Sequence, residues 1–226
     1  MDSAVRFQDR AGAGGLLATK LLRYSNCPDV VVLAIPRGGV PVAFEVAKRL
    51  NVSLDVVLVR KLGVPEHQEL AMGAVALGDV RVLQSDVIQL NRISAALIEE
   101  VATRELKELT RRNEMYRDSR PAPEVRGKTI ILVDDGLATG STMRAAAKAV
   151  KVQKCGRIVV AVPIAAFGVC EELKSQVDEI ICAHTPKFLQ SVGHWYENFT
   201  QITDDEVRKI LMRAKKQKFA LASNEK

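Results

Sequence analysis

Continuous runs of apolar residues alternate along this chain with stretches in which apolar residues recur every three or four positions. A continuous run is typical of a strand buried on both faces, whereas the second spacing is typical of a helix with one face in the core. The runs predict buried strands at 30–35, 53–63, 129–134, 157–165 and 178–184.

Segments with the helical spacing lie before or after most of the predicted strands. The glycine loop after the first strand leads into a helix that carries Val42, Val46 and Leu50, and a longer helix is expected from Ser85 to Arg117. The stretch 64–73 is mixed and has no clear period. Further helices are expected over 1–24 (beginning near Asp9), over 141–153, between the last two strands, and at the lysine-rich end.

Strands that alternate with helices in this way indicate an α/β fold with a mainly parallel, twisted sheet flanked by helices. We expect a single domain over 1–226 with a core at about 28–184. The segments at about 1–24 and 185–226 would pack as a hood over it, and about 85–118 would form a long helical insertion.

Composition narrows the function classes without selecting one. The 226 residues are 47% hydrophobic and 27% charged, with a net charge of +6, which is typical of a water-soluble domain. The N-terminus lacks the apolar stretch of a secretory signal, and Val30–Ile35 is far too short to span a membrane. Four well-separated cysteines and three histidines give no zinc-ligand spacing, so we expect a cytoplasmic protein with reduced thiols.

The most informative stretch is TIILVDDGLATGST, residues 129–142. Ligands of parallel α/β sheets bind beyond the carboxyl ends of the strands, which is where Asp134 and Asp135 fall. The small residues that follow open a helix, whose first turn offers unpaired N–H groups and a positive dipole end to an anion. Carboxylates repel phosphate, so the two acids are expected to face sugar hydroxyls or Mg²⁺.

Other nucleotide motifs are missing. There is no P-loop pattern, and the glycines at 12–15 follow no strand, which excludes a Rossmann fingerprint. A simple helix cap at Ser141 or Thr139 would explain one acid and one hydroxyl, but not both acids with the whole loop.

The stretch resembles the phosphoribosyl-pyrophosphate (PRPP) motif of type I phosphoribosyltransferases: four apolar residues, two acids, a variable stretch, then Thr-Gly-Ser-Thr. The resemblance implies a parallel sheet with a hood, and PRPP with Mg²⁺ as donor. It implies that Asp134 and Asp135 face the ribose hydroxyls, with Mg²⁺ held mainly through PRPP and close to both acids. It also implies a loop around the 5-phosphate, in which Gly136 stands where many members carry Val or Ile. The loop residues are Gly136, Leu137, Ala138, Thr139, Gly140, Ser141 and Thr142.

The segment AIPRGGVP, residues 34–41, resembles the pyrophosphate loop of the same family. Arg37 offers a fork to phosphate oxygens, and Gly38 and Gly39 permit close approach of the backbone. A non-proline cis peptide is common there, and we expect it between Arg37 and Gly38. By resemblance Arg60 and Lys61 also contact the pyrophosphate, with 64–73 as a flexible loop that closes over the donor. Arg37 and Lys61 would be catalytic together with the two acids.

Most of the chain, from FQDRAGAGGLLA to VGHWYENF, resembles bacterial phosphoribosyltransferases that stand alone or are fused to a hydrolase and whose acceptor is undefined. In the family the hood supplies contacts to the base, for which Trp195 and Tyr196 are candidates, either as stacking faces or as plugs between hood and sheet.

The expected function is transfer of the phosphoribosyl group to a nitrogen acceptor, expected to be a nucleobase, with release of pyrophosphate, as in nucleotide metabolism. The alternative is a non-catalytic regulatory protein that senses PRPP, which the net charge and the lysine-rich end permit. No helix-turn-helix or RNA-binding signature is found, so nucleic acid is not an expected partner. We expect small-molecule partners, no membrane contact, and a homodimer by family resemblance.

Overall fold

The computed structural model describes residues 6–65, 67–77, 80–118 and 120–223. Its central sheet has five parallel strands in the order β2-β1-β6-β7-β8. This confirms the predicted α/β class with a mainly parallel sheet. The strands are β1 (Val30–Ala34), β2 (Ser53–Val56), β6 (Thr129–Val133), β7 (Arg157–Ile164) and β8 (Glu179–His184).

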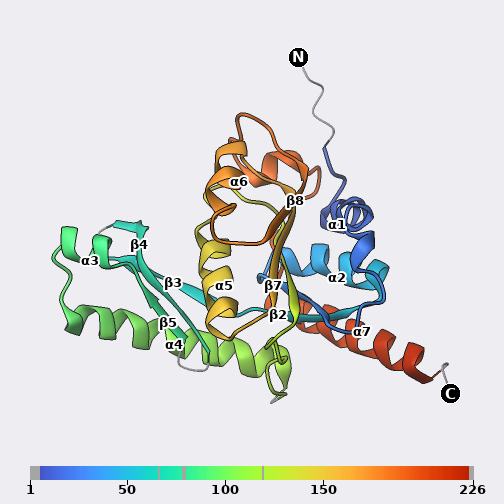
Figure 1. The fold of residues 1–226 in the computed structure, drawn as a ribbon, viewed down its shortest axis with the longest axis horizontal. Coiled ribbons are helices and arrows are strands. Elements are labelled where there is room, and N and C mark those ends of the chain that lie inside the picture. The colour runs from blue at the N-terminus through green and yellow to red at the C-terminus, as the bar shows by residue number, and fades with distance from the viewer. Residues whose placement is uncertain (1–5, 66, 78–79, 119, 224–226) are drawn as a thin grey trace.

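Both faces of this sheet are buried, which is why its central strands are apolar throughout. On β1, for example, Val30, Val32 and Ala34 belong to one buried cluster, whereas Val31 and Leu33 belong to another. The first cluster includes residues of α1 (Arg10–Thr19), α2 (Gly39–Leu50), α4 (Ala95–Arg117) and α7 (Asp204–Ser223). The second includes residues of α5 (Ser141–Val152) and α6 (Phe167–Leu173). Figure 1 shows α1, α2 and α7 on one side of the sheet and α5 and α6 on the other.

The helices begin near the predicted positions. Asp9 caps α1 by accepting a hydrogen bond from the N–H of Gly12 at 2.8 Å, which confirms a helix that starts near Asp9. Short 3₁₀ turns occur at Leu22–Tyr24 and Val192–Trp195. The helices that flank the sheet are α1 (Arg10–Thr19), α2 (Gly39–Leu50), α5 (Ser141–Val152), α6 (Phe167–Leu173) and α7 (Asp204–Ser223).

The strand predicted over 53–63 is wrong in one respect, because the chain changes sheets within it. Residues 53–56 form β2 of the parallel sheet, and β3 (Val59–Val64) then pairs with β4 (His67–Ala76) in an antiparallel sheet completed by β5 (Val80–Leu83). The stretch 64–73, expected to be a loop, therefore lies largely in β4. Register shifts on either side of Gly63 break the alternation, so the sequence shows no clear period there. Residue 66 lies outside the described residues.

The long helix expected over 85–117 is also interrupted. It forms α3 (Ser85–Leu90) and α4 (Ala95–Arg117). Arg92 between them has a positive φ of 50°, and Ser94 caps α4 by accepting from the N–H of Leu97 at 3.2 Å. The three-stranded sheet, α3 and the first part of α4 form an arm that projects from the core in Figure 1.

The two terminal segments meet. Phe7 and Tyr196 form a parallel β-bridge, in which the N–H of Phe7 donates to the carbonyl of Trp195 and the N–H of Glu197 donates to the carbonyl of Phe7, each at 2.8 Å. Among the described residues, no helix combines the length and apolar character that crossing a membrane requires.

Candidate functional site

The two loops singled out in the sequence lie side by side. Strands β1 and β6 are parallel neighbours, with Ala34 opposite Val133, and the N–H of Ile35 donates to the carbonyl of Val133 at 2.8 Å. The chain therefore leaves both strands at the same edge of the sheet. The loop after β1 and the loop after β6 face each other there.

Gly38 and Gly39 allow this contact between the loops. A Cβ atom on Gly38 would lie 2.0 Å from Oδ2 of Asp135, and one on Gly39 would lie 2.6 Å from the carbonyl oxygen of Val133. Neither distance is compatible with a side chain. The two glycines are needed for packing against the acids, whatever else they approach.

The cis peptide bond lies one residue earlier than expected. It joins Pro36 to Arg37, and the predicted cis bond between Arg37 and Gly38 is wrong. Gly38 has helical dihedral angles (φ −60°, ψ −34°), and the N–H of Val40 donates to the carbonyl of Arg37 at 3.1 Å. The Arg37–Gly38 bond is therefore already part of the turn that begins α2, which needs a trans peptide.

The acid pair is held from several directions. The N–H of Asp135 donates to Oδ1 of Asp134 at 2.8 Å, and Nε of Arg10 donates to Oδ2 of Asp135 at 2.9 Å. The hydroxyl of Tyr196 donates to the carbonyl oxygen of Asp135 at 2.6 Å. The Asp135 side chain is only 15% exposed.

These surroundings perturb the protonation of the pair. Burial, together with the neighbouring Asp135 carboxylate, raises the pKa of Asp134 well above its ordinary value. Burial also raises the pKa of Asp135, but the Arg10 guanidinium opposes that rise. Burial and the nearby Asp135 carboxylate raise the pKa of Tyr196, so its phenol remains a hydrogen-bond donor.

The loop after the acids is anchored at one end and open at the other. The N–H of Leu137 donates to the carbonyl of Ile164 at 2.9 Å and the Leu137 side chain is buried. A Cβ on Gly136 would lie 2.6 Å from Cγ1 of Val192. Neither the side chain nor the N–H of Leu137 is therefore available to a ligand, contrary to its prediction as a phosphate contact.

The open part of the loop runs from Ala138 to Thr142. Gly140 has a positive φ of 69° and precedes α5 without a side-chain cap. Ala138, Thr139 and Thr142 are exposed, and the Thr139 and Ser141 hydroxyls lie 3.2 Å apart. Within the described residues, the N–H groups of Thr142 and Met143 have no hydrogen-bond acceptor. This end of α5 can bind an anion.

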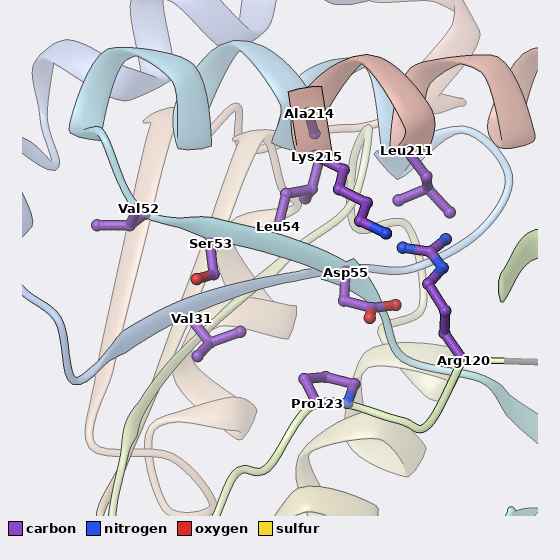
Figure 2. Close-up of a pocket in the computed structure, with 10 residues that line it drawn as sticks. All are labelled: Val31, Val52, Ser53, Leu54, Asp55, Arg120, Pro123, Leu211, Ala214 and Lys215. Atoms are coloured by element: carbon purple, nitrogen blue, oxygen red, sulfur yellow. The ribbon is translucent and has the colours of Figure 1, made fainter. Parts of the chain in front are cut away.

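Two cavities differ in their distance from these loops. One of about 430 Å³ lies beside β2, the outermost strand of the sheet, away from the loops. A larger one of about 730 Å³ adjoins the loops. The remote cavity lies between β2, α7 and the segment around Pro123, with Arg120 and Lys215 at its rim (Figure 2). None of the predicted site residues lines it.

The larger cavity joins segments that are far apart in the sequence. Pro36 and Thr142 meet there with Arg60 and Lys61 of β3. Lys61 also lines a cavity of about 450 Å³ with Ser141 and Lys148. The lining of the larger cavity is Pro36, Val59, Arg60, Lys61, Gly63, Pro65, Arg104, Glu105, Arg112 and Thr142.

Sequence reasoning missed the contribution of α4 to this cavity. Arg104 and Arg112 add positive charge, while Glu105 is the acid among the lining residues. Nε of Arg60 donates to Oε2 of Glu105 at 2.7 Å. These residues look like an ordinary charged helix face in the sequence, and only the folding of α4 against β3 brings them to the loops.

Arg37 is held by the C-terminal segment, a second contact that the sequence did not reveal. Its Nη1 lies 3.9 Å from Oδ1 of Asp204, the first residue of α7. The Tyr116 hydroxyl also donates to Oδ1 of Asp204, and Arg111 donates to Oδ2 at 3.3 Å. Arg37 thus lies where α4, α7 and the loop after β1 meet.

The two aromatic candidates for the hood differ in their surroundings. Tyr196 is 4% exposed, with ring centroids of Phe7 at 5.3 Å and Phe199 at 5.0 Å, so it presents no open face. Trp195 stacks on His184 with centroids 6.1 Å apart. Phe188, 90% exposed, and Phe167, 56% exposed, are the open aromatic faces near the ends of β7 and β8.

Comparison with known proteins agrees with this arrangement of loops. A family model described as "Phosphoribosyl transferase domain" matches residues 9–197. Two proteins of Mycobacterium tuberculosis, from strains CDC 1551 / Oshkosh and ATCC 25618 / H37Rv, are each 45% identical over 208 residues and are named "Putative phosphoribosyl transferase" MT0597 and Rv0571c. Each match covers 92% of this chain but 47% of the relative, so the chain spans about half the length of these curated relatives.

A solved structure, the protein TT1426 from Thermus thermophilus, is similar over nearly its whole length. It superposes with a TM-score of 0.82 at 42% sequence identity, covering 92% of this chain and 98% of that one.

Proposed function

Since this chain belongs to the phosphoribosyl transferase family, we propose that it is a type I enzyme that binds PRPP with Mg²⁺ and transfers the phosphoribosyl group to a nitrogen acceptor, releasing pyrophosphate. The observation that carries the proposal is the junction of three features at one sheet edge. These are the open N-terminus of α5, the largely buried acid pair and the cationic cavity.

The 5-phosphate is assigned to the open part of the loop. The free N–H groups at the start of α5, the Thr139, Ser141 and Thr142 hydroxyls and the positive end of the helix dipole all favour an anion there. Gly140 supports this turn by adopting a positive φ. Gly136 and Leu137 are assigned to the anchoring of the loop.

The pyrophosphate is assigned to the cationic cavity. Arg37, Arg60 and Lys61 are the predicted contacts, and Arg112 joins them from α4. As the bond from C1 to the pyrophosphate breaks, negative charge accumulates on the leaving group, and cations fixed beforehand stabilise it most effectively. The backbone at Gly38 and Gly39 approaches from the loop after β1.

Asp134 and Asp135 are assigned to the ribose hydroxyls. The described residues contain no group of three or more His, Cys, Asp or Glu side chains that could hold a metal ion. That fits Mg²⁺, which proteins usually bind through one or two carboxylates together with substrate phosphates. Mg²⁺ would be held mainly by PRPP near the two acids and would neutralise charge on the phosphates.

The chemistry requires no nucleophilic side chain. Displacement at C1 passes through a transition state that resembles an oxocarbenium ion, as in glycoside hydrolysis. The chain's contribution is to position the ribose through the acids, bind the departing pyrophosphate and offset the positive charge on the ring.

The acceptor is proposed to be a nucleobase. Stacking needs an open aromatic face, which Tyr196 lacks and which Phe188 and Phe167 have. We therefore assign Tyr196 to support of the site, retain Trp195 as a candidate for contact with the base, and add Phe188 as a stacking candidate. A single domain, a cytoplasmic location, small-molecule partners and a homodimer complete the proposal.

Calorimetric titration with PRPP and Mg²⁺ tests the donor site. Wild type should bind with micromolar affinity, and the double variant D134N/D135N should lose binding. The matched control D86N/E99Q removes two exposed acids on the arm and should bind like wild type. Absence of binding by the folded wild type would refute the proposal.

Screening nucleobases for PRPP-dependent pyrophosphate release then tests catalysis. Release with a particular base identifies the acceptor. Tight PRPP binding without release for any base would contradict transfer to a nucleobase and favour a PRPP-sensing protein.

A further inference from the structure

Arg10 occupies an unfavourable position for a cation. It is the first residue of α1, immediately after the cap Asp9, where the positive end of the helix dipole disfavours positive charge. Its side chain is nevertheless buried, with 9% of it exposed. Buried arginines are retained only with partners, so the contacts of this residue must offset both costs.

Those contacts converge on Asp135. Nε of Arg10 donates to Oδ2 of Asp135 and Nη1 donates to the carbonyl of Thr200, both at 2.9 Å. The guanidinium carbon lies 3.9 Å from the centroid of the Phe199 ring, at cation–π distance. The acid, the carbonyl and the ring together fix the orientation of the planar group.

The main chain of Asp135 is fixed by the same region. The Tyr196 hydroxyl donates to its carbonyl oxygen, and the guanidinium carbon of Arg10 lies 5.9 Å from the Tyr196 ring centroid. The missing Cβ of Gly38 leaves room for the carboxylate in this orientation. Both terminal segments thus hold one acid of the pair.

A cationic partner stabilises the pair, because two adjacent, largely buried carboxylates repel each other and are poorly solvated. Arg10 is such a partner, since its guanidinium hydrogen-bonds directly to Asp135. The arginines and Lys61 that line the cationic cavity come from β3 and α4 instead.

We propose that Arg10 is a positioning residue, which holds the Asp135 carboxylate in the orientation that binds the ribose of the donor. This inference rests on the proposed function. Arg10 acts through Asp135 and does not itself contact the donor. If Arg10 only docked α1 onto the core, its loss would weaken donor binding to the same extent whether or not Asp135 is present.

A double-mutant cycle separates these two roles. Calorimetric titrations with PRPP and Mg²⁺ would compare wild type, R10Q, D135N and R10Q/D135N. We expect R10Q to weaken binding about 10- to 100-fold, as is typical when a residue that orients a binding group is lost. In the D135N background the same substitution should change the affinity less than about twofold, since the oriented carboxylate is already gone.

Two further variants complete the test. R10K keeps the positive charge, and we expect it to recover part of the affinity for PRPP that R10Q loses. If circular dichroism shows that R10Q does not fold, R10K replaces it in the cycle. R157Q removes an arginine paired with Glu179 at 3.2 Å at the start of β7, the opposite edge of the sheet, and should bind like wild type.

The outcomes distinguish this inference from the proposed function. If D135N binds the donor measurably but more weakly than wild type, and folded R10Q binds like wild type, the role of Arg10 is overturned and the donor site stands. Equal losses in both backgrounds overturn it too, since Arg10 would then act independently of Asp135. No binding by folded wild type overturns both.

Discussion

The two ends of the candidate donor site are built differently. At the acid pair, charges are buried and fixed by short contacts from distant segments, as with Arg10, Thr200 and Phe199. At the cationic cavity, charges are several and partly exposed, with the side chain of Arg60 37% exposed and that of Arg104 67% exposed. Donor binding at the acid pair should therefore depend on the orientation of fixed groups. Donor binding at the cationic cavity should depend on the total positive charge, which salt can screen.

The largest effect should come from disturbing the buried end. G38A would place a methyl group 2.0 Å from Oδ2 of Asp135 and displace the carboxylate. We expect loss of PRPP binding and destabilisation by about 1–3 kcal/mol, the usual range for overpacking. Urea unfolding and calorimetry would measure both. G15A is the matched control, because its Cβ meets nothing within 4 Å, and it should be neutral or slightly stabilising.

Removing a charge from the exposed end should have a smaller effect that depends on salt. K61A is expected to weaken PRPP binding about tenfold at low ionic strength and by less at about 0.5 M salt, where the Debye length falls to a few ångströms. Titrations at several salt concentrations would show it. A loss that is the same at every salt concentration would indicate that Lys61 acts by geometry, and the contrast between the two ends would fail.

Asp204 connects the loop after β1 to α4 and should show a moderate effect that depends on pH. Desolvation opposes the shift, but hydrogen bonds from Tyr116 and Arg111 lower the pKa of Asp204. A depressed folded-state pKa stabilises the protein above the unfolded value, and that stability is lost as pH falls through the folded value. D204N should therefore be less stable at pH 7 by about 1 kcal/mol.

Thermal melts between pH 7 and pH 3 would check the sign. The difference between wild type and D204N should shrink below about pH 4, where the unfolded carboxyl becomes protonated. A difference that instead grows toward low pH would mean that the contacts of Asp204 in the folded protein favour its neutral form.

The smallest expected effect is an increase in the affinity for PRPP. Glu105 is the acid that lines the cationic cavity and it bonds to Arg60. E105Q removes a negative charge while leaving a hydrogen-bond acceptor, so PRPP should bind about two- to threefold more tightly at low salt. Weaker binding would show that holding Arg60 in place matters more than the net charge of the cavity.

The core of the fold could be predicted from the sequence for a physical reason. Strands such as β1 and β6 are buried on both faces, so their residues must be apolar at nearly every position, and the pattern is visible without knowledge of their partners. The arm lacks this property. In β3, buried and partly exposed residues do not alternate regularly, and the register shifts near Gly63 disturb the period further.

The candidate site divides in the same way. Asp134, Asp135 and the loop after them form one local stretch at the end of a strand, so their nearness follows from the sequence alone. Arg10 lies 125 residues from Asp135 in the chain, and Asp204 lies beyond both loops. Contacts of this kind depend on how helices dock, which no local pattern records.

Gly136 has a consequence for variation among relatives. The space that a side chain at this position would fill is taken by Val192, whose two methyl carbons would lie 2.6 Å and 2.8 Å from an added Cβ, and by Ile164 at 2.7 Å. The size of the side chain at position 136 therefore limits the size of the side chain that position 192 can hold, and the reverse is also true. A relative with Val or Ile at position 136 must carry a smaller residue at position 192. Covariation between these two positions would therefore show in which relatives the C-terminal segment packs against the loop.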